Sequence, residues 1–166
     1  MLDAGRAGLA YADITTGEFA TTQLSGEEVA TTVVEEIDRL RPAEIVTTDP
    51  QFLHQNLEVG TARNAPQGTE PAPRGPIVTE YERWPFELET AQQALLDHFE
   101  VARLDGFGVG GQPLAIRAAG GLLHYLSETQ RASLQQLSNL RTYSTQQFMV
   151  LDAATRRNLE LVESLR

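Results

Sequence analysis

The chain of 166 residues contains no cysteine and no lysine, and it has no apolar run as long as a membrane-spanning helix. Without cysteine it can form no disulfide, thiolate metal site or catalytic thiol, a composition that fits a reducing compartment. Its longest apolar runs fall well short of the roughly 18 residues that a transmembrane helix needs, and its first residues do not resemble a signal peptide. We therefore expect a cytoplasmic chain that makes no contact with a membrane.

Positive charge is also scarce. All 13 basic residues are arginine, and the formal net charge is −10. The first 83 residues hold 6 arginines and 14 acidic residues, against 7 and 9 in the remainder. Because nucleic-acid phosphates bind to positive surfaces, the first half is a poor DNA-binding face. Its acidity indicates either an ordinary solvated surface or a docking face for a partner protein.

The first half of the chain predicts a β-hairpin and a helix around one core. Its 41% hydrophobic and 22% charged residues are ordinary for a globular protein. Residues 9–14 and 19–24 predict two strands joined by the turn at residues 15–17. Residues 25–28, Ser-Gly-Glu-Glu, have the spacing of a capping box. Apolar residues at helical spacing follow it, namely Val29, Val33, Ile37 and Leu40.

A strand and a short helix are predicted next. Pro42 ends the preceding helix, and the β-rich run at residues 43–47 is typical of a buried parallel strand. Asp49 and Pro50 then start another helix. Residues 60–76 hold four prolines and three glycines with little apolar content, which predicts a surface loop inserted within one domain.

The second half predicts one more strand and two helices. The strand restarts at residues 77–79, and residues 84–86 lead into a helix whose apolar residues are Leu88, Ala91, Leu95 and Phe99. A Gly-rich turn at residues 106–111 precedes a longer helix with an apolar stripe of Leu114, Ala118, Leu122 and Leu126. Gly120 and Gly121 in its middle each cost roughly 1 kcal/mol relative to alanine, which favours close approach of another backbone there. The whole order predicts an α/β domain with mixed strand directions.

The last residues predict a strand and a helix that belong to something larger. Residues 148–151 have the pattern of a buried strand, and Asp152 is a suitable helix N-cap. The helix that follows has an apolar stripe of Leu159, Val162 and Leu165 and no stop signal before Arg166. We expect this stripe to need partners from further parts of a longer protein.

Five segments carry a resemblance to a known family. They are G-L-A-Y-A-D-I-T-T-G-E-F at 8–19, R-P-A-E at 41–44, D-G-F-G at 105–108, A-A-G-G-L-L-H-Y-L with T-Q at 118–130, and F-M-V-L-D-A-A-T-R-R-N-L-E-L at 148–161. Together they resemble the MutS family of bacterial DNA mismatch-repair ATPases. The first four are similar to its connector domain (domain II), and the last is similar to the opening of its core (lever) domain.

The resemblance implies an RNase H-like connector domain at residues 1–146 and a truncated start of the α-helical core domain at 147–166. In the family the connector links the mismatch-recognition domain to the core, and the connector itself lies where the partner MutL docks. The resemblance implies no catalytic, cofactor or metal residues here: DNA, ATP and Mg would be bound by other domains of a nucleoid-associated parent. The family also has a strand before the segment at 8–19. Only seven residues precede that segment here, so we expect this strand to be missing or reduced.

Four carboxylates raise a competing hypothesis. Asp13 lies on the first strand, where nucleases of the RNase H fold place a metal-binding aspartate, and Glu18, Glu44 and Asp49 are conceivable partners for a two-Mg²⁺ site. The alternative is that Asp13 accepts backbone hydrogen bonds from the Thr-Thr-Gly turn that follows it, and we favour this. The function classes left open are a connector without activity of its own, a metal-dependent nuclease and a free-standing protein-binding module.

Three further motifs have both a chemical and a structural interpretation. The glycines at 106–111 allow a phosphate loop, but no Gly-Lys-Ser/Thr follows, so a tight joint between helices is favoured. The histidines at positions 54, 98 and 124 are dispersed, as structural histidines are. Arg156, Arg157 and Asn158 lie at the start of a helix and could grip a phosphate or carboxylate. We favour contacts between these three residues and neighbouring domains.

Overall fold

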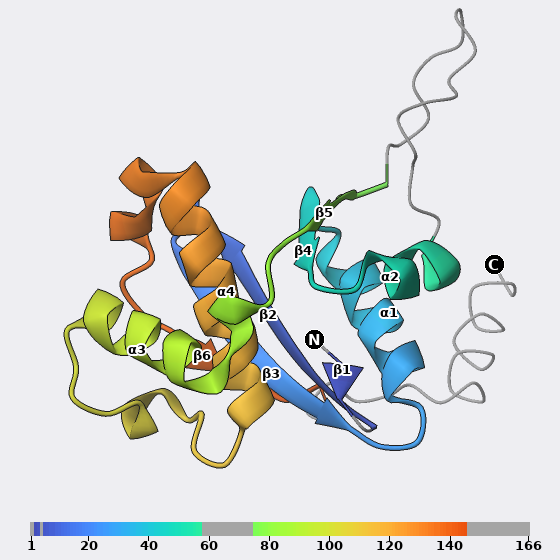
Figure 1. Ribbon diagram of the computed structural model, residues 1–166, viewed down its shortest axis with the longest axis horizontal. Coiled ribbons are helices and arrows are strands. Elements are labelled where there is room, and N and C mark those ends of the chain that lie inside the picture. Colours follow the sequence, from blue (N-terminus) through green and yellow to red (C-terminus); the bar gives the residue numbers. More distant parts are fainter. Residues whose placement is uncertain (1, 4, 58–74, 146–166) are drawn as a thin grey trace, which may run out of the picture.

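The computed structural model describes residues 2–3, 5–57 and 75–145 (Figure 1). Several predicted features lie outside these residues. They are most of the loop at 60–76, the strand at 148–151, the helix from Asp152, and the candidate interdomain residues Arg156, Arg157 and Asn158. No helix of the described part is long and apolar enough to cross a membrane.

The predicted hairpin forms the main sheet. Its strands β2 (Arg6–Asp13) and β3 (Glu18–Ser25) pair antiparallel along their whole length. The two-residue strand β1 (Leu2–Asp3) pairs antiparallel with the start of β2, and β6 (Arg141–Thr142) pairs parallel with β3, giving the order β1-β2-β3-β6. Before the hairpin, the described residues hold the two-residue strand β1.

A second, separate sheet holds two parallel strands, β4 (Glu44–Thr47) and β5 (Ile77–Glu80). The parallel direction predicted for residues 43–47 is confirmed. Full burial of this strand was the wrong expectation, because Glu44 is exposed and the other three residues are only half-buried. Among the described strands β4 has β5 as its single neighbour, so one edge lacks the second strand that would bury it.

Two helices cover the second sheet and one end of the hairpin. Helix α1 (Val29–Leu40) begins after Glu28 without a side-chain cap, so the predicted capping box is wrong. Ser25 is instead the last residue of β3, paired with Arg6, which keeps it away from the helix start. Helix α2 (Pro50–Asn56) begins as predicted, with the Asp49 carboxylate accepting a 3.4 Å hydrogen bond from the Phe52 N–H.

Helices α3 (Leu88–Phe99) and α4 (Pro113–Thr129) cover the other end, with α4 lying across the hairpin and α3 beside it (Figure 1). Three short 3₁₀ turns connect these elements: η1 (Trp84–Phe86), η2 (Asp105–Phe107) and η3 (Arg131–Gln136). The predicted close approach of another backbone is confirmed at Gly120, whereas the neighbour of Gly121 is a side chain. A Cβ at Gly120 would meet the backbone of Ala91, and one at Gly121 would meet the Phe86 ring.

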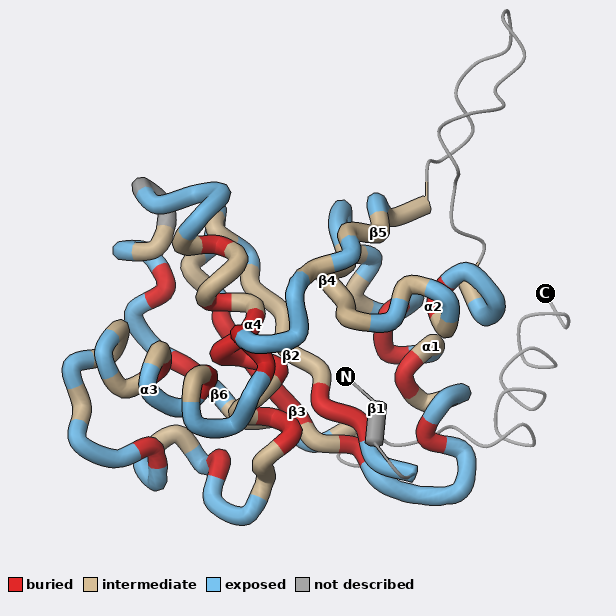
Figure 2. The backbone as a smooth tube through the Cα atoms, in the orientation of Figure 1, coloured by how far each residue is buried: buried red, intermediate tan, exposed pale blue. Residues whose placement is uncertain are grey.

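The core has two parts, one on each side of the hairpin. The larger cluster packs β3 and α4 against α3 and the segment after η3, and includes Phe19, Leu95, Leu123 and Leu137. The smaller cluster packs the start of the hairpin against α1 and α2, and includes Ala7, Val33, Ile37 and Leu53. Figure 2 shows this burial along β3 and α4, whereas no residue of β4 or β5 is fully buried. The architecture is thus mixed α/β.

Candidate functional site

Asp13 serves the hairpin turn. Its Oδ1 accepts hydrogen bonds from the Thr15 N–H at 2.8 Å and the Thr16 N–H at 3.3 Å, and its carbonyl accepts one from the Gly17 N–H at 2.8 Å. The backbone donors at Thr15 and Thr16 hold the pKa of this exposed carboxyl below its ordinary value. The favoured interpretation of Asp13 as a turn residue is confirmed.

The three carboxylates considered with Asp13 make separate contacts. Glu18 accepts hydrogen bonds from the Tyr11 hydroxyl at 2.7 Å and from Arg141 at 3.2 Å. Glu44 accepts from the hydroxyls of Thr79 and Tyr125, and Asp49 caps α2. Within residues 2–3, 5–57 and 75–145, no group of three or more acidic or histidine side chains could hold a metal ion. The nuclease hypothesis therefore gains no support from these residues.

The glycine-rich segment joins two helices, as favoured from the sequence. Residues 105–111 connect α3 to α4 through η2, and Gly108 and Gly111 have φ angles of 76° and 75°, in the left-handed region that glycine adopts easily. The Gly108 N–H donates to the Asp105 carbonyl at 3.2 Å, which closes the turn. This backbone hydrogen bond makes the segment a tight joint between the two helices.

The three histidines lie on three helices. His54 is exposed on α2, and the His98 Nε2 lies 2.8 Å from the Leu137 carbonyl oxygen. The His124 Nδ1 lies 2.8 Å from the Tyr81 hydroxyl. The dispersed, structural interpretation fits each of these positions.

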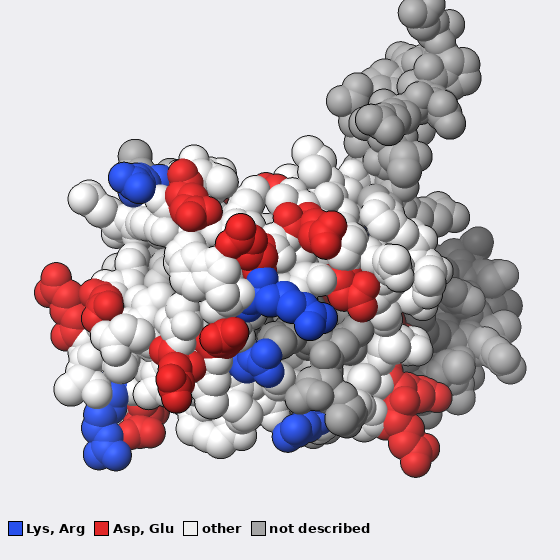
Figure 3. Space-filling view, in the orientation of Figure 1, with Lys and Arg blue, Asp and Glu red and all other residues white. Residues whose placement is uncertain are grey.

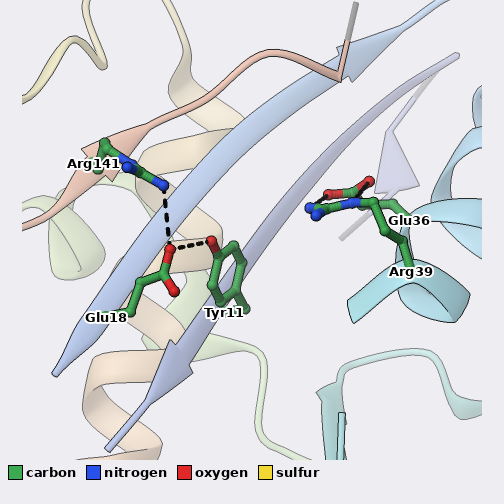
Figure 4. A network of polar contacts seen from close by, with 5 residues as sticks. All are labelled: Tyr11, Glu18, Glu36, Arg39 and Arg141. Atoms are coloured by element: carbon green, nitrogen blue, oxygen red, sulfur yellow. Dashed lines mark hydrogen bonds and ion pairs between the residues drawn. The ribbon is translucent and has the colours of Figure 1, made fainter. Parts of the chain in front are cut away.

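Sequence reasoning missed a polar cluster on α1 and the neighbouring sheet, whose Glu36–Arg39 pair and Tyr11–Glu18–Arg141 group are drawn in Figure 4. On α1, Arg39 binds the Glu36 carboxylate through two nitrogens, at 2.9 and 2.5 Å, and only 6% of the Glu36 side chain is exposed. Burial raises the pKa of Glu36, but hydrogen bonding to Arg39 and Tyr143, together with the charge of Arg39, outweighs burial and holds this pKa below its ordinary value. The i, i+3 spacing of Glu36 and Arg39 was a signal in the sequence for this ion pair, but the spacing does not show that the Glu36 side chain is buried.

Tyr143 completes this cluster from the segment after β6. Its ring packs edge-on against Tyr11 at 5.7 Å, and the Arg39 guanidinium lies 6.0 Å from the ring centre. Burial first, and then the neighbouring Glu36 carboxylate, raise the pKa of Tyr143 well above its ordinary value. Each charge in the cluster has an opposite partner, so the arrangement fixes α1 against the hairpin and offers no free acid or base for catalysis.

An aromatic patch lies on the surface where β5, η1 and α4 meet, and we call Tyr81, Trp84 and His124 the Trp84 patch. The Trp84 and His124 rings meet edge-to-face at 4.5 Å, and Trp84 remains 45% exposed. Tyr81 donates to Glu128 at 2.6 Å, and burial followed by this hydrogen bond raises its pKa well above the ordinary value. Leu88, four residues after Trp84, is 40% exposed. Large exposed apolar side chains of this kind suit protein contacts.

A cavity of about 780 Å³ separates the two sheets. Its walls are residues 7–12 of β2, the β4 segment, the apolar face of α1 and residues of α4. Its lining is largely apolar and includes Leu9, Val33, Ile45, Phe52 and Leu122. No sequence pattern indicated this cavity, because it depends on how the two sheets are spaced.

Charges on the surface do not form a DNA-binding face in the view of Figure 3. Acidic side chains are spread over this face, and the basic ones lie among them, several of them near its centre. Three ion pairs occur among the described residues, each between one arginine and one carboxylate: Arg39–Glu36, Arg103–Asp105 and Arg141–Glu18. The distribution agrees with the net charge of −10.

Comparison with known proteins gives one consistent result. The family model described as MutS domain II matches residues 1–141. The chain is 44% identical to the DNA mismatch repair protein MutS of Thermosynechococcus vestitus over 160 residues, covering 96% of this chain and 18% of that protein. It is 38% identical to that of Chloroflexus aurantiacus over 190 residues, covering 99% of this chain and 20% of that protein. The chain thus spans about one fifth of the length of these relatives.

Proposed function

Because the chain belongs to the MutS family of DNA mismatch repair proteins, we propose that it is the connector segment of a mismatch-repair ATPase. In this role it links the mismatch-recognition and core domains, has no activity of its own, and docks a MutL-type partner. The observation that carries the proposal is the domain II match over residues 1–141. ATP, Mg and DNA belong to other domains of the parent.

The fold supports an RNase H-like connector as part of this proposal. A long antiparallel hairpin, a parallel strand pair and helices on the sheet faces occur together in one mixed α/β domain. The proposed connector ends at residue 146, and residues 147–166 begin the core domain. Arg156, Arg157 and Asn158 in that second part are proposed to contact neighbouring domains of the parent.

The Trp84 patch supports the docking role. Tryptophan and tyrosine are enriched among the residues that carry the binding energy of protein interfaces. Trp84 is a large apolar side chain that remains exposed. The acidic surface of the domain disfavours nucleic acid as the partner that contacts it. We therefore assign the partner contact to Trp84 and the nearby exposed Leu88.

A binding measurement tests the docking role. The chain and its Trp84→Ala variant are compared for binding to the MutL-type protein from the same source, by biolayer interferometry. We expect at least a tenfold loss of affinity, as for a central aromatic contact worth about 2 kcal/mol. Ile77→Ala is the control, because Ile77 is 68% exposed on β5 and should change affinity less than twofold. Equal binding by Trp84→Ala, with an unchanged melting temperature, would place the contact elsewhere.

A further inference from the structure

Trp84 is the only tryptophan of the chain, and 45% of its surface is exposed. Its ring is nevertheless held by neighbouring side chains. The indole Nε1–H donates to the Glu82 carboxylate, and the ring meets His124 edge-to-face at 4.5 Å. The His124 Nδ1 in turn lies 2.8 Å from the Tyr81 hydroxyl. Because the ring is already ordered, a partner that contacts it loses little affinity to the entropy of fixing this side chain.

Two exposed carboxylates border the Trp84 patch, and each is tied to one of its rings. Glu82 accepts from the Trp84 indole, and Glu128 accepts from the Tyr81 hydroxyl at 2.6 Å. Both hydrogen bonds use the Oε2 atom of the carboxylate. An ionised carboxylate can accept on both of its oxygens, so Oε1 of Glu82 and of Glu128 can each receive a further donor.

The segment that carries Trp84 is also acidic. Residues 80–89 contain four glutamates and one arginine. That arginine, Arg83, lines the cavity between the two sheets, and so does Arg117, whose Nε donates to a backbone carbonyl of η1 at 2.7 Å. Among the described residues, the one cation–π contact lies elsewhere, on the ring of Tyr143. Trp84 thus combines an exposed aromatic surface with acidic surroundings, and no arginine of the described part lies over its ring.

This combination suits one kind of side chain. A cation is attracted to the face of an aromatic ring, and tryptophan attracts it more strongly than tyrosine or phenylalanine. The guanidinium of arginine is planar, so it can stack on the ring while its N–H groups donate to a neighbouring carboxylate. The ammonium of lysine is compact and strongly hydrated, and it is less suited to stacking. Glu82, hydrogen-bonded to the indole, is the neighbouring carboxylate here.

We infer that the Trp84 patch receives an arginine side chain of the docking partner, whose guanidinium stacks on the exposed Trp84 surface and donates to Glu82. Glu128 adds to the attraction from the Tyr81 side of the patch. The exposed Leu88 takes an apolar side chain of the same partner segment, which is therefore both basic and apolar. The identity of the partner rests on the proposed function, whereas the chemistry of its segment rests on the contacts of the patch.

The test uses a synthetic peptide of three arginines alternating with three leucines, and a control peptide in which citrulline replaces each arginine. Citrulline has nearly the same shape as arginine but carries no charge. Binding to the full chain is followed by the fluorescence of Trp84, which can be read directly because the chain has no other tryptophan. We expect the arginine peptide to change this fluorescence and to bind at least about tenfold more tightly than the citrulline peptide.

Two double variants separate this contact from general attraction to an acidic chain. Glu82→Gln with Glu128→Gln removes the two charges of the patch and leaves amide oxygens as acceptors for the ring donors. Asp97→Asn with Glu100→Gln removes the same charge from two exposed residues at the other end of α3, roughly 15 Å from Leu88 along the helix. We expect the first double variant to bind the arginine peptide at least about fivefold more weakly, and the second less than about twofold.

Three results would overturn the inference: equal binding of the two peptides, unchanged Trp84 fluorescence, and an equal loss of affinity in the two double variants. The MutL-type protein separates this test from the docking test. If Trp84→Ala loses its binding but the Glu82→Gln, Glu128→Gln variant does not, the docking role holds and the arginine contact is overturned. If the arginine peptide binds as expected but the MutL-type protein binds Trp84→Ala equally well, the docking role fails and the chemistry of the patch holds.

Discussion

Glu36 is a nearly buried carboxylate whose charge depends on one arginine. With Arg39 present, the pKa of Glu36 lies below its ordinary value of about 4.5. A lowered folded-state pKa contributes stability above the unfolded-state pKa, and this contribution is lost as the pH falls through the folded-state pKa. The contribution is therefore fully present at neutral pH and is lost as the pH falls below the ordinary value of about 4.5 and on through the lowered folded-state pKa.

The variant Glu36→Gln tests this directly. At pH 7 we expect a loss of about 1–2 kcal/mol of stability, because the amide keeps only one acceptor oxygen, so one of the two hydrogen bonds from the partly exposed Arg39 is lost and the other no longer has a charged acceptor. The difference in melting temperature between the two proteins should narrow as the pH falls from 5 to 3. Thermal melts followed by circular dichroism measure it. A difference that stays constant over this range would mean that Glu36 is not ionised in the folded chain.

At the scale of elements, the close packing of α3 against α4 depends on the absence of a side chain at Gly120. A Cβ at Gly120 would lie 2.4 Å from the Cα and the carbonyl oxygen of Ala91, so the two helices must separate to admit it. Gly120→Ala should destabilise the chain by about 1–3 kcal/mol through overpacking, although alanine is favoured in a helix by about 1 kcal/mol. Urea denaturation measures this. Gly110→Ala is the control, since its Cβ would meet nothing within 4 Å, and an equal loss there would contradict the packing explanation.

A buried hydroxyl on β3 helps to join the hairpin to α4. The buried Thr21 Oγ1 lies 3.0 Å from the Leu9 carbonyl oxygen and 2.9 Å from the Ala115 carbonyl oxygen. Thr21→Val keeps the shape but leaves these acceptors without the hydroxyl, so we expect a loss of about 1–3 kcal/mol. Thr21→Ser keeps the hydroxyl and should lose less. If urea denaturation gives the opposite order for the two variants, the methyl group matters more than the hydrogen bonds.

At the scale of the whole molecule, the charge distribution governs what the chain binds. The net charge is −10, no lysine is present, and arginines are paired with carboxylates in three places among the described residues. Since sequence-independent affinity for DNA comes from positive charge, the chain by itself should bind DNA poorly and without preference for mispairs. Fluorescence anisotropy with G·T and matched duplexes at physiological salt checks this. A nanomolar preference for the G·T duplex would contradict it.

Local features of the chain could be predicted from the sequence because their causes are local. The hairpin at residues 6–25, the Asp49 cap and the turn role of Asp13 each depend on residues a few positions apart. The contact demanded by Gly120 was also predictable, because a glycine in mid-helix is costly without one. The capping box failed because pairing of Ser25 with Arg6 in the sheet competes with a local helix cap.

The sequence by itself determined the order of helices and strands from β2 to α4, the acidic charge, the absence of thiol chemistry and the family resemblance. Only the tertiary structure decided that β4 is half-buried, that Glu36 is buried with Arg39, that Trp84 is exposed, and that two strand edges face each other across a cavity. The physical reason is that burial and edge pairing depend on residues far apart in the chain. The composition of a strand shows whether its side chains suit burial. The arrangement of the two sheets decides whether neighbouring elements cover that strand.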